Sequence, residues 1–257
     1  MHVYAESLSD VSRYIENNCN LTLDDHRPVF ESYLDRVGRF IKIDSSTRIL
    51  EIGVGTGWFP ILCKVNGLSC KGLEISPQLI EYACQFGRAC GVEPDIELGN
   101  VEDCELGRER YDVIIASSVF EHIEHWRRAL AKVYAALKPG GVLFFESSNK
   151  FSLTSGEFHF PLYGWLPDFL RYRLRIARQG PDIMKLGIDF NQFTYPLLRR
   201  TFRKLGFTQV FDRLTLARPE TIVSPLKRFM VRVGKQFPPV GELTLLFADT
   251  TTFVCVK

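Results

Sequence analysis

The sequence predicts an α/β fold with a doubly wound, largely parallel sheet, and two observations predict it. Short β-rich runs alternate with helical patterns between residues 48 and 145. A glycine-rich turn follows the first run, and the stop signal Lys138-Pro-Gly-Gly141 precedes the fifth. Strands that alternate with helices form right-handed βαβ units in one parallel sheet. Ligands of such sheets bind beyond the carboxyl ends of the strands, where the strand order reverses.

Five strands are expected in the first part of the chain, because each run is short and rich in aliphatic residues. These runs are 48–52, 69–73, 95–98, 111–116 and 141–145. Between them, one helix is expected to begin at Pro77 and another to run from Trp126 to Leu137. Residues 1–46 are expected to form N-terminal helices, the second of which begins at Pro28.

After residue 147 the regular alternation stops, and two inserts are expected. Residues 148–194 are rich in aromatic residues, proline and arginine, and exceed the length of an ordinary connection. A basic helix follows at 195–205, and the second insert contains an amphipathic helix at 222–236. Strands at 207–214 and 250–256 complete the sheet. We therefore expect a single domain over 1–257, with a cofactor-binding core at 47–147, a substrate lid at 148–194 and a C-terminal part at 195–257.

The composition excludes several protein classes. The 257 residues are 46% apolar and 24% charged, close to the average for globular proteins, which excludes disordered, collagen-like and coiled-coil chains. The net charge of +2 excludes a general polyanion binder, but the charge is unevenly distributed. Residues 1–150 hold 16 basic and 22 acidic side chains, whereas residues 151–257 hold 16 and 8. The two parts are therefore expected to face different partners, and that of the second part is expected to be anionic.

Cysteine usage and the first residues indicate a reducing, cytoplasmic location. The seven cysteines are odd in number and form no Cys-x-x-Cys pair, which disfavours a disulfide framework or a thiolate zinc site. Residues 1–10 lack the basic and apolar regions of a secretory signal, and no apolar run is long enough to span a bilayer.

The loop Glu51-Ile-Gly53-Val-Gly55-Thr-Gly57 is the sharpest functional signal. Glycines allow a tight turn and a close approach of a ligand to the backbone, and the start of the following helix favours an anionic group. The alternative is a βα turn without a ligand. Three alternating glycines carry an entropic cost that needs a reason, so a ligand site is favoured.

The acids near this loop indicate which ligand it binds. The spacing is G-x-G-x-G instead of the dinucleotide pattern G-x-G-x-x-G, and no Gly-Lys-Ser/Thr follows, which excludes a P-loop. Glu51 would repel a pyrophosphate and attract an ammonium. Glu74 ends the second strand and suits the two hydroxyls of a ribose. S-adenosylmethionine carries an ammonium, a sulfonium and a ribose but no phosphate, so the loop favours it over NAD or ATP.

Residues 49–147 resemble the class I S-adenosylmethionine-dependent methyltransferases, and within them the small-molecule type 11 enzymes. Leu50-Glu-Ile-Gly-Val-Gly-Thr-Gly57 resembles the first motif, and further motif-like segments lie at 72–76, 99–103, 111–122 and 137–141. The resemblance implies a Rossmann-like sheet of seven strands whose last strand, 250–256, is antiparallel. It implies S-adenosylmethionine as cofactor and S-adenosylhomocysteine as product. It also implies cofactor contacts at Glu51, Gly53, Gly55, Gly57, Glu74, Ile75, Asn100, Val101 and Ser117. Asn100 stands where the family carries Asp, and its side-chain carbonyl can still accept from the adenine amine.

Methyl transfer needs an aligned nucleophile and often a base that removes its proton. His122 is the first candidate base, because it follows the fourth strand at the mouth of the expected site and an imidazole titrates near neutral pH. The alternative is that Glu121 and His122 only begin the next helix. His159, in the expected lid, is the second candidate, and His125 is expected at the surface.

The run Ser117-Ser-Val-Phe-Glu-His122 also resembles the ubiquinone-pathway O-methyltransferases, in which acids and a histidine of this run are implicated in metal binding. Here Ser118 replaces the first acid. A hard cation such as Mg²⁺ prefers several oxygen ligands. We therefore expect no essential metal.

The two inserts bear on the acceptor. An aromatic run at 158–170 precedes four arginines, which suits ring stacking and the binding of a phosphate or carboxylate; the alternative is a packed structural insert. These arginines are Arg171, Arg173, Arg175 and Arg178. In the helix at 222–236, one apolar face is bordered by basic residues and comprises Leu226, Phe229, Met230 and Val233. That face either contacts a membrane surface or docks on the core.

We therefore expect O-methylation, by in-line displacement, of a small-molecule, glycan or amphiphilic acceptor that is anionic or lipid-linked. The first insert is similar to that of bacterial type 11 enzymes associated with surface polysaccharides. Contact with the inner membrane surface through 222–236 is an open alternative to a purely cytoplasmic location. Two other functions are alternatives: a non-catalytic S-adenosylmethionine-binding scaffold and a nicotinamide oxidoreductase. Nucleic-acid methylation is disfavoured, because no Asn-Pro-Pro-Tyr or Pro-Cys motif follows the fourth strand.

Overall fold

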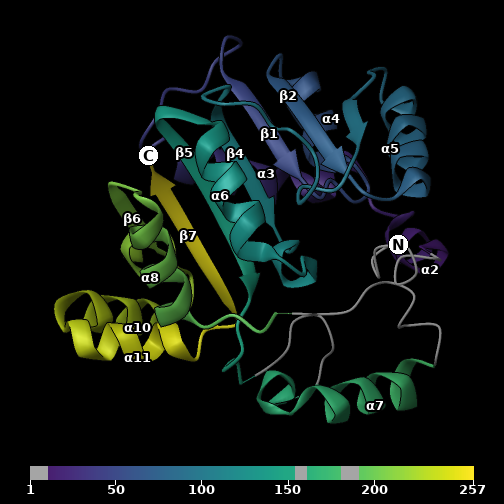
Figure 1. The fold of residues 1–257 in the computed structure, drawn as a ribbon. Helices are drawn as coiled ribbons and strands as arrows, with labels where there is room; N and C mark the ends of the chain where they lie inside the picture. Colours follow the sequence, from purple (N-terminus) through teal and green to yellow (C-terminus); the bar gives the residue numbers. More distant parts are fainter. Residues whose placement is uncertain (1–10, 154–160, 181–190) are drawn as a thin grey trace.

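The computed structural model describes residues 11–153, 161–180 and 191–257, which form a seven-stranded sheet covered by helices on both faces (Figure 1). The strands are β1 (Arg48–Ile52), β2 (Ser69–Glu74), β3 (Asp95–Leu98), β4 (Tyr111–Ser117), β5 (Leu137–Ser148), β6 (Gln209–Asp212) and β7 (Thr250–Val256). Their order in the sheet is β3-β2-β1-β4-β5-β7-β6. β1 to β5 pair in parallel, and β7 is antiparallel to β5 and β6. The predicted fold class, with its antiparallel last strand, is confirmed.

Two apolar cores lie on opposite faces of the sheet, because successive side chains of a strand point to opposite sides. On one face, Leu50 and Ile114 pack in a core with α6 (Trp126–Ala136) and α8 (Tyr195–Leu205). On the other face, Ile49 and Ile115 pack in a core with α3 (Leu23–Val37) and α4 (Trp58–Val65). The central strands are covered on both sides, which accounts for their nearly unbroken apolar sequences.

Side chains satisfy the first N–H groups of two of the helices before β3. α2 (Ser12–Asn18) precedes α3, and the expectation that α3 begins at Pro28 is wrong. Thr22 and Asp25 form a capping box, in which the Thr22 N–H donates to the Asp25 carboxylate at 2.8 Å, so the helix begins five residues earlier. α5 (Pro77–Ala89) does begin at Pro77, and the hydroxyl of Ser76 caps it.

The part after β5 contains two helices that the sequence did not predict, α7 (Asp168–Gln179) and α11 (Pro238–Leu246). The strand expected at 207–214 is shorter, because Asp212 caps a one-turn helix, α9 (Arg213–Leu216). The amphipathic helix expected at 222–236 is α10 (Pro225–Gln236). In Figure 1, α10 and α11 lie side by side at the lower left, beyond β6 and α8, while α7 lies below the sheet.

Three of the four residues of the apolar face expected on α10 do not dock on the core, and the fourth, Val233, is half-buried. Leu226 and Phe229 are 68% and 65% exposed, and Met230 is exposed as well. The core-docking interpretation of this face is therefore wrong. α10 therefore presents large apolar side chains to solvent, an arrangement that often marks an interaction surface.

Candidate active site

A cavity of about 390 Å³ lies at the carboxyl ends of β1, β2 and β4. The strand order reverses between β1 and β4, so this is the switch point at which parallel sheets bind ligands. Its wall contains His122 and all but one of the residues expected to hold the cofactor. Those on the wall are Glu51, Gly53, Gly55, Glu74, Ile75, Asn100, Val101 and Ser117.

The glycine loop after β1 has a backbone that only glycine adopts readily. Gly53, Gly55 and Gly57 have φ angles of 73°, 55° and 79°, all in the left-handed region. A Cβ atom at Gly53 would lie 2.6 Å from Val119 Cγ2, and one at Gly57 would lie 2.5 Å from the Cβ of Ala83. Gly57 is not on the cavity wall, so its role in the structure is to let α4 begin close to α5.

Glu74, at the end of β2, is tied to this loop. One carboxylate oxygen accepts the N–H of Gly55 at 3.0 Å, and the other accepts those of Ile75 and Ser76 at 2.9 and 3.0 Å. Burial raises the pKa of Glu74, while the backbone hydrogen bonds oppose that rise. Each oxygen keeps acceptor capacity for a hydroxyl donor, because a carboxylate has about four lone-pair positions.

Glu51, near the end of β1, is a buried acid that the protein does not satisfy. It is 5% exposed, and within the described part of the chain its Oε2 atom has no hydrogen-bond partner. Burial raises the pKa of Glu51 well above its ordinary value, and the charges of Cys63 and Glu74 raise it further. A buried carboxylate oxygen on a cavity wall is costly unless a cation or donor from the ligand reaches it.

Asn100 and Val101 lie in the turn after β3. The side-chain carbonyl of Asn100 accepts the N–H of Glu102 at 2.9 Å, which closes a local turn, and one of its lone pairs remains. Val101 is buried and contributes an apolar part of the wall. Glu102, which the sequence did not single out, accepts the backbone N–H of His125 at 2.6 Å and so fixes this turn to the start of α6.

The turn after β4 brings Ser117 and His122 to the same cavity. Ser118, between them, has a φ of 52°, a strained value for a residue other than glycine. His122 ends a short 3-10 helix, η1 (Phe120–His122), and is half-buried, whereas the His125 side chain is exposed. His159 lies outside the described residues.

Three aromatic residues on the wall were missed by the sequence reading: Tyr14 of α2, Tyr33 of α3 and Trp58 of α4. The hydroxyl of Tyr33 lies 2.8 Å from that of Ser117, and Tyr14 lies next to the loop, since a Cβ at Gly55 would be 2.9 Å from its hydroxyl. No motif marks Tyr14 and Tyr33, because helices from elsewhere in the chain bring them to the site, whereas Trp58 directly follows Gly57 of the glycine loop.

The wall fits the cofactor expected from the sequence. The unsatisfied oxygen of Glu51 suits an ammonium, the acceptor capacity of Glu74 suits ribose hydroxyls, and a loop without side chains leaves room beside both.

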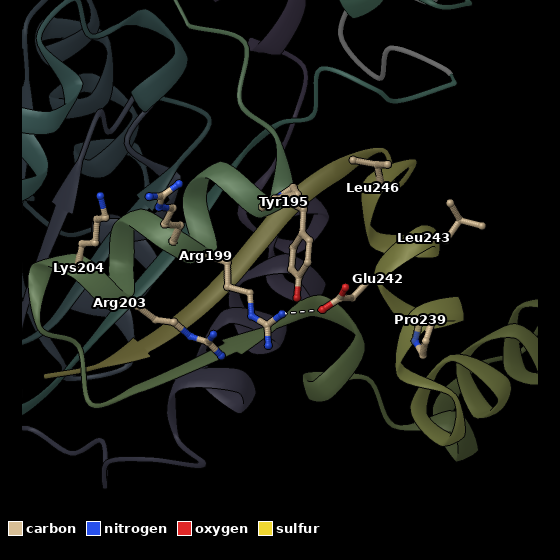
Figure 2. Close-up of a pocket in the computed structure, with 10 residues that line it drawn as sticks. Tyr195, Arg199, Arg203, Lys204, Pro239, Glu242, Leu243 and Leu246 are labelled. Carbon is tan, nitrogen blue, oxygen red and sulfur yellow. Dashed lines mark hydrogen bonds and ion pairs between the residues drawn. The ribbon is translucent and has the colours of Figure 1, made fainter.

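A larger cavity, of about 610 Å³, lies between α8 and α11 (Figure 2) and contains none of the predicted site residues. Among the described residues, no group of three His, Cys, Asp or Glu side chains is placed to hold a metal ion. Within the same ranges, none of the helices combines the length and apolarity needed to cross a membrane.

Comparison with known proteins identifies one matching family and many similar proteins. The family described as "Methyltransferase domain" matches residues 25–218. The ubiquinone biosynthesis O-methyltransferase of Coxiella burnetii is 24% identical over 164 residues, 64% of this chain and 64% of that protein. That of Nitrobacter winogradskyi is 31% identical over 119 residues, 45% of this chain and 44% of that protein. The chain thus spans less than two thirds of the length of these relatives.

Solved structures share the fold. An S-adenosylmethionine-dependent methyltransferase from Archaeoglobus fulgidus aligns with a TM-score of 0.58 and 19% identity, over 96% of this chain and 100% of that one. Phosphoethanolamine N-methyltransferase 2 of Haemonchus contortus, in complex with phosphomonomethylethanolamine and S-adenosylhomocysteine, aligns with a TM-score of 0.56 and 16% identity. That alignment covers 88% of this chain and 52% of the other.

Proposed function

The chain belongs to the methyltransferase domain family of class I S-adenosylmethionine-dependent enzymes, and on that premise we propose that it methylates an oxygen atom of a small anionic or amphiphilic acceptor. When bound, S-adenosylmethionine supplies an electrophilic methyl group on a positively charged sulfur. The observation that carries the proposal is the buried, unsatisfied Oε2 atom of Glu51 beside the glycine loop. We infer that this oxygen pairs with the ammonium of the cofactor, Glu74 with the ribose hydroxyls and the turn at Asn100 and Val101 with adenine.

We propose His122 as the base that takes the proton of the acceptor hydroxyl. Burial raises the pKa of Tyr33, so that phenol stays protonated at neutral pH and can donate a hydrogen bond but not accept the proton. Glu51 and Glu74 are assigned to the cofactor. The imidazole of His122 shares their cavity, and imidazole is the side chain whose ordinary pKa lies nearest neutral pH. His159 stays a second candidate.

The anionic character of the acceptor rests on the charge of the second part of the chain and on α7. Residues 151–257 hold twice as many basic as acidic side chains. Arg171 and Arg175 on α7 are buried; the guanidinium of Arg171 donates to the carboxylate of Asp168 at 2.7 Å and lies 5.6 Å from the ring centre of Tyr163. Two buried cations, with an aromatic ring beside one of them, suit a phosphate or carboxylate attached to an apolar group.

The names of the relatives support this class. The curated relatives are named O-methyltransferases of ubiquinone biosynthesis, and one structural relative is in complex with a phosphorylated acceptor. The first supports transfer to oxygen, and the second supports a negatively charged acceptor.

The test is release of S-adenosylhomocysteine over a panel of paired acceptors. Each pair holds a hydroxyl compound and its charged counterpart, such as catechol with 3,4-dihydroxybenzoate and a hexose with its 6-phosphate. We expect turnover and a preference for the charged member. Cofactor binding without turnover on any pair would favour a scaffold, and preference for the neutral members would contradict an anionic acceptor.

A further inference from the structure

α10 is an amphipathic helix whose apolar face is mostly exposed; Arg228, Val231 and Val233 are half-buried, and Gly234 is buried beside Gly241 of α11. The guanidinium of Arg228 donates to the carbonyl of Ile222 at 2.7 Å, and the ammonium of Lys235 donates to the carbonyl of Ala217 at 2.6 Å. Leu226 is exposed on the other side. Globular proteins usually bury the apolar face of such a helix, so the exposed Leu226, Phe229 and Met230 indicate a partner.

α11 holds this arrangement in place. A Cβ atom at Gly241 would lie 2.5 Å from the carbonyl oxygen of Gly234, so the two helices cross with their backbones close together. The α10–α11 hairpin, residues 223–243, carries a set of exposed large apolar side chains. They are Val223, Leu226, Phe229, Met230, Phe237, Val240 and Leu243. Val223, at its start, is 90% exposed.

The surroundings of the hairpin are basic. Residues 213–246 hold six Lys and Arg but two Asp and Glu, and α8 adds four basic residues with no acid. Figure 2 shows this row of α8 along the groove that faces α11, where Arg199 pairs with Glu242 at 2.8 Å. Leu243 and Leu246 form the apolar opposite side of that groove. Cationic side chains of α8 therefore lie across this groove from apolar side chains of α11.

We propose that the α10–α11 hairpin docks on the surface of an anionic lipid bilayer. Apolar side chains of an interfacial helix enter the acyl boundary, while flanking Lys and Arg attract acidic headgroups. A second copy of the chain would bring two basic hairpins together, and such like charges oppose pairing. An anionic bilayer instead complements both the apolar stripe and its charge.

The hairpin stands at the edge of the sheet that holds the active site. It directly precedes β7, whose first residue, Thr250, pairs with Ser148 at the end of β5. Trp165 stacks on Phe247 with ring centres 6.0 Å apart, which joins the segment after β5 to the end of α11. Docking through the hairpin therefore places the cofactor-binding edge, and not the opposite edge, toward the bilayer.

Vesicle co-sedimentation tests this proposal, using phosphatidylcholine vesicles with and without 30% phosphatidylglycerol. We expect binding to the anionic vesicles that weakens as salt rises, and little binding to the neutral ones. Leu226→Asn/Phe229→Asn should lower binding at least about tenfold, because both apolar anchors are lost. Val65→Asn, an exposed apolar change on α4, is the matched control and should bind like wild type.

A second variant, Lys227→Glu/Arg232→Glu, changes only exposed charges and should remove the preference for anionic vesicles. S-adenosylhomocysteine binding by every variant, measured separately, shows that the fold and the cofactor site are intact. Equal binding of all variants, or no binding of wild type to anionic vesicles, would overturn the proposal. A wild-type dimer in sedimentation velocity that Leu226→Asn/Phe229→Asn dissociates, without vesicle binding, would overturn it in favour of self-association.

Discussion

The carboxylate of Glu74 accepts a hydrogen bond from the backbone N–H of Gly55 at 3.0 Å. This contact ties the end of β2 to the middle of the glycine loop after β1. The glycine loop and the acid that ends β2, which are separate patterns in the sequence, therefore form one structural unit. Because this bond forms in the protein itself, the loop is arranged before a ligand arrives, which lowers the ordering cost of binding.

Gly55→Ala should weaken S-adenosylhomocysteine binding at least about tenfold, because a Cβ atom there is strained at positive φ and lies 2.9 Å from the Tyr14 hydroxyl on the cavity wall. Gly67→Ala is the matched control. Gly67 also has a positive φ, 70°, but nothing lies within 4 Å of its Cβ position. Both changes are expected to lower stability. The affinity measured by isothermal titration therefore distinguishes the two variants, whereas their stability does not. Equal affinities in the two variants would contradict the role of the loop.

Glu51→Gln should change the pH dependence of stability. The folded-state pKa of Glu51 is raised by burial, so the folded chain holds a proton that the unfolded chain releases. The free energy of unfolding of the wild type should therefore fall as pH rises from about 4.3, the ordinary glutamate value, through the raised pKa. Urea unfolding at several pH values should show a flatter profile for Glu51→Gln.

Glu97→Gln serves as the control for that profile. Glu97 on β3 is an exposed acid whose pKa is lowered by its hydrogen bond and ion pair with Lys71. Its removal should leave the fall of stability at higher pH unchanged. A wild-type profile that rises with pH over the same interval, and that Glu51→Gln does not alter, would argue against a buried uncompensated acid.

His122→Ala should slow methyl transfer by roughly 10²–10⁴-fold and leave S-adenosylhomocysteine affinity unchanged, if the imidazole is the base. His125→Ala is the control, because its exposed side chain can be removed while its backbone N–H keeps the bond to Glu102. Steady-state kinetics on an acceptor found in the panel measures both. Unchanged turnover in His122→Ala would show that His122 is not the base.

Tyr33→Phe should lower the free energy of unfolding by about 1 kcal/mol, because it removes the hydrogen bond with Ser117 and leaves the serine hydroxyl in the cavity wall without it. A double-mutant cycle with Ser117→Ala isolates the pair. We expect a coupling of about 0.5–1.5 kcal/mol from denaturant unfolding. Additive effects of the two changes would show that the hydroxyls do not interact.

Much of the sheet was predictable because its signals are local. β1, β3 and β7 have the expected bounds, and α8 ends at Gly206, which adopts the left-handed conformation of a helix stop. The helix start expected at Pro28 was wrong, because the capping box of Thr22 and Asp25 is a stronger start signal than a proline.

The two missed helices escaped prediction for different reasons. α7 has apolar residues at helical spacing, but Phe169, Leu170 and Ile176 are exposed while Arg171 and Arg175 are buried, so the usual pattern is reversed. α11 begins with two prolines, contains Gly241 and is apolar on most sides, which hides its period.

In the site, the sequence identified the residues at strand ends, where loops follow a shared pattern. It did not identify Tyr14 or Tyr33, which reach the cavity from helices through tertiary packing, or Trp58, which directly follows the glycine loop. Nor does the spacing of α10 show which of its sides faces the chain, because that depends on tertiary packing, in which Gly234 lies beside Leu214 and Gly241.

The central claim is that the cavity behind the glycine loop binds S-adenosylmethionine through Glu51 and Glu74. Isothermal titration of S-adenosylmethionine into wild type, Glu51→Gln and Glu74→Gln tests it most directly. We expect one saturable site per chain in the wild type. Each variant should bind S-adenosylmethionine at least about tenfold more weakly, because it loses a charge-assisted hydrogen bond. No binding by the wild type, or the same affinity in all three proteins, would contradict it.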